Sequence, residues 1–106
     1  MNFLKSVTVN NIYTKFKIPY SNFYIIRWFP KARTDIHNHD GKQCKFMALN
    51  GSLHECRFNK KSINGYIQSN PILPLKIYSI NDSEGYHQIY NIDDRIKWSI
   101  HKYYII

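Results

Sequence analysis

The sequence predicts an all-β domain with little helix. Nine tyrosines and six phenylalanines occur among 106 residues, alongside many isoleucines, and such aromatic and β-branched side chains favour strands. Long stretches of alanine, leucine, glutamate and lysine at helical spacing are absent. Short apolar runs between turn residues favour a small antiparallel barrel or sandwich, and any helix is expected to be a turn or two near the N-terminus.

The first clear strand signals lie in the N-terminal half of the chain. Residues 23–29 form an aromatic and β-branched run that should end at Pro30, because proline cannot donate to a strand ladder. Residues 36–39 are expected to begin a second extended segment.

A turn signal follows at Asn50-Gly51, where both residues tolerate positive φ. It predicts a two-residue hairpin between strands at 43–49 and 52–58. Asn64-Gly65 marks another turn. Further strands are expected at 66–68, at 75–80 after a loop bracketed by Pro71 and Pro74, at 87–92 and at 97–105.

Length and composition indicate one folded domain over residues 1–106. A chain of this size can bury a core without disulfide or metal staples, and 43% hydrophobic residues argue against disorder. No linker, repeat or low-complexity tract divides it. We expect the protein to be a monomer.

Neither export nor membrane insertion is suggested by the sequence. Residues 1–10 lack the hydrophobic run and the cleavage site of a signal peptide, and no apolar stretch is long enough to cross a bilayer. We therefore expect a cytoplasmic protein with no membrane partner. Cys44 and Cys56 should not form a disulfide, because thiols stay reduced in that compartment.

The net charge of +8 raises the question of nucleic-acid or anionic-membrane binding through phosphate contacts. The basic residues are scattered along the chain, however, which is typical of a solvated surface. We do not expect nucleic-acid binding to be the main role. The tightest basic groups are Lys60-Lys61, and Arg27 with Lys31 and Arg33.

Histidines supply the candidate metal ligands. His37 and His39 are one residue apart, so on an extended strand their imidazoles would share a face. By itself this pair is equally consistent with two surface histidines. His87 is a third candidate, and three neutral imidazoles would leave the other positions of a metal open for substrate and oxygen.

The residues after the histidine pair extend this pattern into a motif. Cys44 follows His39 by five residues, and Gly51 follows seven residues later at a turn. This spacing resembles the first motif of the cupin superfamily, in which glutamate commonly stands at the position of Cys44. His87 with Asn91 resembles the end of the second cupin motif, although its usual proline and first glycine are missing.

A cysteine in place of that glutamate narrows the resemblance to the cysteine dioxygenases, iron-dependent thiol oxygenases built on the cupin barrel. The likeness runs from about Tyr13 to Tyr103. The segments that carry it are Tyr13-Thr14, Trp28, residues 36–39, Cys44, residues 50–53, residues 80–83 ahead of His87, and residues 99–103.

The resemblance implies a small, jelly-roll-like antiparallel cupin barrel that holds Fe(II) through His37, His39 and His87. It implies that the chain adds both atoms of O2 to the sulfur of L-cysteine and so produces cysteine sulfinic acid. Neutral ligands leave Fe(II) with its full positive charge, which suits an anionic thiolate, and sulfur favours a late first-row metal.

Ser99, His101 and Tyr103 occupy alternate positions on one expected strand and so share a face. Spacing alone fits the polar outer face of an edge strand. The resemblance instead implies that the serine orients the histidine, that the histidine hydrogen-bonds the tyrosine, and that the phenol reaches the iron site. It also implies a thioether between Cys44 and Tyr103, although an isolated cysteine is usually a small buried hydrophobe.

The expected substrate-binding residues are Tyr13 and Lys15. Lys15 stands where the family has an arginine that grips the substrate carboxylate, and lysine keeps the charge but loses the two-pronged geometry. 3-Mercaptopropionate is therefore a competitor to cysteine as substrate. Spacing alone is equally consistent with a solvent-exposed Lys15.

Two rival functions remain at the level of sequence. One is a non-catalytic cupin that binds a metal, a partner or an anionic ligand. The other is a metal-dependent sugar isomerase or another cupin enzyme, although these usually keep the carboxylate ligand that this chain lacks. Cys44 together with the Ser99, His101 and Tyr103 series favours the dioxygenase, because a binding cupin has no need to keep them together.

Overall fold

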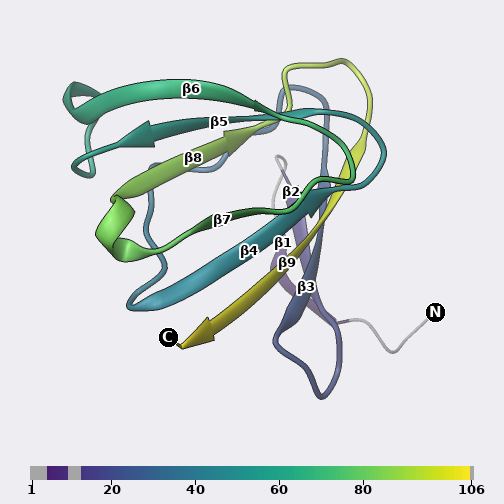
Figure 1. The fold of residues 1–106 in the computed structure, drawn as a ribbon. Coiled ribbons are helices and arrows are strands. Elements are labelled where there is room, and N and C mark those ends of the chain that lie inside the picture. The colour runs from purple at the N-terminus through teal and green to yellow at the C-terminus, as the bar shows by residue number, and fades with distance from the viewer. Residues whose placement is uncertain (1–4, 10–12, 106) are drawn as a thin grey trace.

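The computed structural model describes residues 5–9 and 13–105, and these residues form two antiparallel β-sheets that face each other (Figure 1). The larger sheet has the strand order β1-β2-β3-β9-β4-β7 and the smaller sheet has the order β6-β5-β8. The strands are β1 (Lys5–Val9), β2 (Tyr13–Lys17), β3 (Phe23–Trp28), β4 (Lys42–Ala48), β5 (Leu53–Phe58), β6 (Tyr66–Ile72), β7 (Tyr78–Ile80), β8 (Tyr86–Tyr90) and β9 (Lys97–Ile105).

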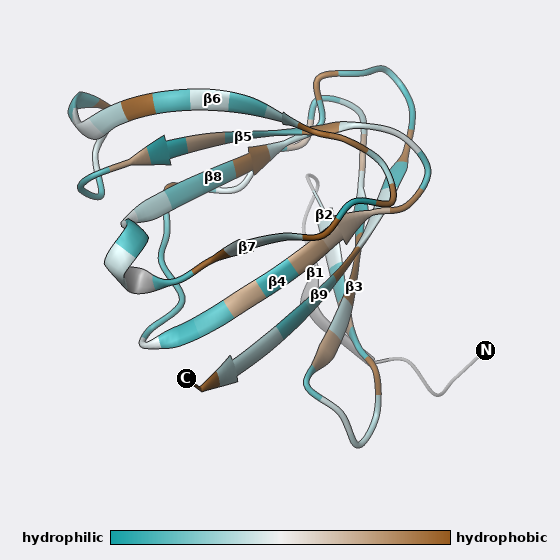
Figure 2. Cartoon of the chain, in the orientation of Figure 1, coloured by the Kyte–Doolittle hydropathy of each residue, from teal (hydrophilic) through white to brown (hydrophobic). Residues whose placement is uncertain are grey.

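The core lies between the sheets and follows from the two-residue period of the strands. On β4 the inward residues Cys44, Phe46 and Ala48 are buried, and Figure 2 shows the corresponding alternation of hydrophobic and hydrophilic bands along this strand. On β9 the inward positions are also buried but polar, among them Ser99 and His101. The centre of the larger sheet therefore presents polar groups to the interior.

The all-β prediction is confirmed, but the hairpin expected at Asn50-Gly51 is wrong. β4 pairs with β9 and β7, whereas β5 pairs with β6 and β8, so this turn carries the chain from one sheet to the other. The Asn50 side chain accepts a bond from the Trp98 amide at 2.7 Å and donates one to the Ile96 carbonyl at 3.3 Å. The turn is thus attached to the start of β9. β4 and β5 pair with different strands because each is buried in a different sheet.

The expected helical turns lie elsewhere in the described chain. Residues 5–9 near the N-terminus form β1, and short 3-10 turns occur instead at Ile63–Gly65 and Asp82–Glu84. β6 continues through Pro71, which the sequence placed in a loop, because an edge strand tolerates the missing donor. No helix among the described residues is long and apolar enough to span a membrane.

Candidate metal centre

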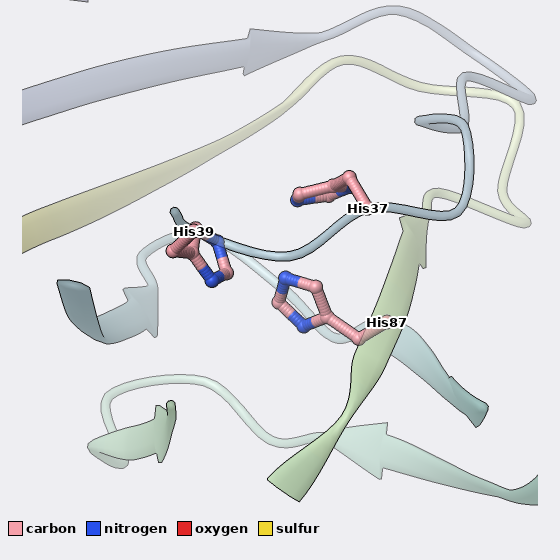
Figure 3. Close-up of side chains that lie close together, drawn as sticks. All are labelled: His37, His39 and His87. Atoms are coloured by element: carbon pink, nitrogen blue, oxygen red, sulfur yellow. The ribbon is translucent and has the colours of Figure 1, made fainter. Parts of the chain in front are cut away.

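Three histidine side chains converge between the two sheets (Figure 3). His37 and His39 lie in the connection between β3 and β4, and His87 lies on β8. One nitrogen from each ring can be chosen so that all three lie within 4.8 Å of one another. This cluster is the set of potential metal ligands that the sequence predicted.

The extended strand expected at residues 36–39 is wrong, since this segment is a loop with one isolated bridge. In that bridge the His37 amide donates to the His87 carbonyl at 3.0 Å, and the His87 amide donates to the His37 carbonyl at 2.9 Å. The loop is thereby fixed to β8. Backbone pairing across the two sheets, rather than strand alternation, brings the first and third ligands together.

Two of the imidazoles are oriented through their Nδ1 atoms. His37 Nδ1 lies 2.9 Å from the Asp35 carbonyl oxygen, and His87 Nδ1 lies 2.8 Å from Glu55 Oε2. Because a carbonyl and a carboxylate can only accept, each Nδ1 carries a hydrogen, and Nε2 is the nitrogen left to face a metal. Both rings therefore have the orientation that a metal ligand needs.

Glu55 is the site residue that sequence reasoning missed. It is buried on β5, where its second oxygen accepts a 2.8 Å bond from Arg57 Nε. Burial works to raise the pKa of this carboxyl, but the hydrogen bonds from His87 and Arg57 outweigh it, so the pKa lies below its usual value. The sequence did contain a sign of this role. Glu55 is two residues from the apolar Leu53 on an expected strand, so both side chains should point inward.

The cluster fits a divalent transition metal. Burial, followed by the proximity of His87, lowers the pKa of His37, so this imidazole is neutral near pH 7. Neutral imidazoles suit iron, zinc, copper and nickel. In metal sites the ring nitrogen that does not bind the metal typically donates a hydrogen bond, as Nδ1 does here in His37 and His87. The donor set therefore fits a resident metal ion of this class.

Ser99 and His101 form a hydrogen-bonded chain behind the histidine cluster. Trp28 Nε1 donates to Ser99 Oγ at 2.8 Å, and Ser99 Oγ lies 2.7 Å from His101 Nε2. Because the indole can only donate, Ser99 Oγ accepts from Trp28 and still has a lone pair and its own hydrogen available for the bond to His101 Nε2. Burial, reinforced by nearby cationic and imidazole groups, places the pKa of His101 well below its usual value, so the ring is neutral, and its Nδ1 lies 4.0 Å from Cys44 Sγ.

Tyr103 is held by Lys15 and Cys44 in this structure. Lys15 Nζ donates to Tyr103 Oη at 3.1 Å, and Cys44 is the cross-strand neighbour of Tyr103. His101 stacks on the phenol ring with centroids 6.4 Å apart. Burial raises the pKa of Cys44 to about 12, and burial with the neighbouring Cys44 raises that of Tyr103 well above its usual value.

A cavity of about 360 Å³ opens onto these groups. Seven of the nine site residues predicted from the sequence line it: Tyr13, Lys15, His37, His39, His87, His101 and Tyr103. The other two, Ser99 and Cys44, are buried behind the lining. Lys15 is half-buried rather than solvent-exposed, and burial lowers its pKa.

Comparison with known proteins identifies related sequences and folds. The model of the cysteine dioxygenase type I family matches residues 9–105. AerE from Microcystis aeruginosa has a TM-score of 0.78 at 16% identity, over 97% of this chain and 46% of its own. A predicted oxalate decarboxylase from Thermotoga maritima has a TM-score of 0.74 at 14% identity, over 97% and 94% of the two chains.

The cupin domain of Drosophila melanogaster CENP-C is also similar, with a TM-score of 0.71 at 12% identity over 95% of this chain and 75% of its own. At these identities the solved structures show that the fold is a cupin fold. No curated protein matches the sequence.

Replacing Glu55 by glutamine should weaken metal binding about 10- to 100-fold, because an amide holds His87 Nδ1 less firmly than a carboxylate does. Glu84→Gln is the matched control, since Glu84 contacts the same Arg57 side chain at 3.0 Å but is exposed and does not reach His87. Titration with Co²⁺, followed by its absorption, measures the affinity. Equal weakening in both variants would contradict the role assigned to Glu55.

Proposed function

The chain belongs to the cysteine dioxygenase type I family, and on that premise we propose that it is a cytoplasmic, Fe(II)-dependent thiol dioxygenase. Its first-choice substrate is L-cysteine, and its product is cysteine sulfinic acid. The observation that carries this proposal is the opening of the His37, His39 and His87 cluster into the same cavity as Lys15 and Tyr103.

His37, His39 and His87 are the residues that would hold the iron. A bound Fe(II) would supply the redox-active centre at which O2 and the thiol react. The protein contributes neutral ligands, so the charge of the ion is undiminished and an anionic sulfur is attracted. The buried Glu55 carboxylate holds His87 in place.

Lys15 is the residue we assign to the substrate carboxylate. Its ammonium group is half-buried and directed toward Tyr103 Oη, so a carboxylate placed there would meet a charged donor and a phenol donor together. Charge-assisted hydrogen bonds in a partly buried site are about twice as strong as neutral ones. Tyr13 lines the same cavity and contributes a second phenol to this polar wall.

Tyr103 would act as a proton donor during oxygen chemistry. Its raised pKa, caused by burial and by Cys44, keeps the phenol protonated near pH 7. The hydrogen-bonded chain from Trp28 through Ser99 fixes the His101 ring, and this ring stacks on Tyr103. The phenol is therefore held in one orientation by its neighbours.

A second substrate, 3-mercaptopropionate, is favoured by one specific observation. Lys15 provides a single-point contact to a carboxylate, and an arginine fork would fix the substrate more strictly. A thiol carboxylate without an amine would satisfy Lys15 equally well. The alternative function is a non-catalytic, metal-binding cupin, which would keep the histidines without turning over either thiol.

Oxygen uptake tests the proposed reaction. Protein loaded with Fe(II) under anaerobic conditions should consume O2 with L-cysteine or 3-mercaptopropionate, with the sulfinate identified by mass. His87→Ala should abolish uptake because it removes one ligand, whereas His54→Ala, a histidine outside the cluster, should retain it. Bound iron without uptake on either thiol would favour the non-catalytic cupin.

Lys15→Met should raise KM for carboxylate-bearing thiols by about 10- to 100-fold, as expected when a charged hydrogen bond of about 1.5–3 kcal/mol is lost. Turnover of cysteamine, which has no carboxylate, should be unaffected by this change. Lys15→Arg should restore carboxylate binding. Steady-state oxygen uptake with the three proteins measures these effects, and an unchanged KM in Lys15→Met would remove Lys15 from the substrate site.

The Cys44–Tyr103 thioether is expected to form during turnover, with O2 as the oxidant and the loss of two hydrogens at the joined peptides. In Cys56→Ser protein, where Cys44 is the only thiol, the denatured chain should show one reactive thiol before turnover and fewer afterwards. Peptide mass spectrometry locates the link. Only unlinked peptides after repeated turnover would show that the cross-strand pair does not react.

A further inference from the structure

The larger sheet has an outer face on the side opposite to the cavity. The proposed dioxygenase activity does not use the side chains of this face. Side chains alternate along a strand, so Ser99, His101 and Tyr103 point inward while Trp98, Lys102 and Tyr104 point outward. The described elements comprise strands and two short 3-10 turns, and no helix among them covers this face (Figure 1).

The strands of the larger sheet are strongly basic. They contain eight of the 15 lysines and arginines of the chain and none of its seven aspartates and glutamates. The eight are Lys5, Lys15, Lys17, Arg27, Lys42, Lys45, Lys97 and Lys102. The sheet therefore gathers charges that looked scattered along the sequence.

Three of these cations project from the outer face without a carboxylate partner. Lys45 and Lys102 are directly opposed on β4 and β9, and like charges in this position destabilise a strand pair. Arg27 lies on β3, directly opposite Trp98. Within the described part of the chain, none of the three forms an ion pair, so the face carries uncompensated positive charge.

Aromatic rings lie among these cations. Phe16 and Trp98 stack with centroids 6.4 Å apart, and the Arg27 guanidinium carbon lies 5.5 and 5.8 Å from their centroids. Lys45 Nζ and Lys102 Nζ lie 5.8 and 5.6 Å from the Tyr104 ring. The outward side chains of β2, β3, β4 and β9 thus form two clusters of rings and cations, one at Trp98 and one at Tyr104, with Ile25, Ile100 and Met47 between them. We call this surface the outer basic face.

We propose that the outer basic face binds single-stranded nucleic acid, with phosphates on Arg27, Lys45 and Lys102 and bases stacked on Trp98 and Tyr104. Positive charge along a backbone track, combined with rings on which bases stack, is the usual chemistry of single-strand recognition. Trp98 and Tyr104 are six residues apart on β9, about 20 Å, and RNA-binding sheets with exposed rings stack two or three bases. Among the described elements no α-helix projects from this face to enter a duplex groove.

Binding of a labelled oligothymidylate, followed by fluorescence anisotropy at several salt concentrations, tests the electrostatic part. Three phosphate contacts predict a slope of log K against log [salt] of about −2 for a single strand. Lys45→Gln/Lys102→Gln should make the slope less negative by about 1.4, since two contacts are lost. Lys60→Gln/Lys61→Gln has the same change in net charge but lies in the exposed loop after β5, and it should leave the slope unchanged.

Tryptophan fluorescence tests the stacking. Trp98 is partly exposed whereas Trp28 is fully buried, so quenching by oligothymidylate should come from Trp98 and disappear in Trp98→Leu. Loss of this ring should weaken binding about 5- to 150-fold. Circular dichroism melting of each variant separates loss of binding from loss of fold.

Three results would overturn the proposal. One is no binding at 50 mM salt. Another is equal weakening in the two double variants, which would indicate net charge rather than this face. The third is equally tight binding of heparin or of phosphatidylserine vesicles without tryptophan quenching by oligothymidylate, which would identify a general polyanion or membrane surface.

Discussion

The reciprocal backbone bridge between His37 and His87 is the constraint on which the site depends. Two hydrogen bonds of 3.0 and 2.9 Å join a loop attached to the larger sheet to β8 in the smaller sheet. This bridge brings together ligands that are 50 residues apart in sequence and leaves both rings facing the cavity. Glu55 then fixes the His87 ring from the neighbouring strand β5. The histidine cluster is thus a consequence of how the two sheets are joined.

The polar interior of β9 has a structural cost that the fold meets with hydrogen bonds. Buried polar groups destabilise a protein unless they are paired, and such networks are strongest in a low-dielectric interior. Ser99 and His101 are paired with each other and with Trp28, whose indole reaches them from β3. These hydrogen bonds fix the positions of the Trp28, Ser99 and His101 side chains. The network reaches the cavity at His101, whose ring stacks on Tyr103 there.

One strand serves two surfaces of different chemistry. The buried inward side chains of β9 include Ser99, His101 and, at its first residue, Lys97 paired with Asp93, whereas the outward ones include Trp98, Lys102 and Tyr104. Since these sets alternate along the same backbone, substitutions on one face leave the side chains of the other in place. The strands of the larger sheet contain no acidic residues, and this affects both faces. On the inner face, no carboxylate from these strands competes with a substrate carboxylate for Lys15. On the outer face, no carboxylate from these strands balances the charges of Lys45 and Lys102.

The sequence by itself determined the strand content, the three histidines and the common face of Ser99 and Tyr103, because residue preference and two-residue alternation are local properties. The tertiary structure decided what depends on pairing partners. The turn at Asn50-Gly51 has the residues of a hairpin, yet burial of β4 and β5 in different sheets makes it a crossover. The contact of Glu55 with His87 and the juxtaposition of Lys45 with Lys102 both depend on which strands lie side by side.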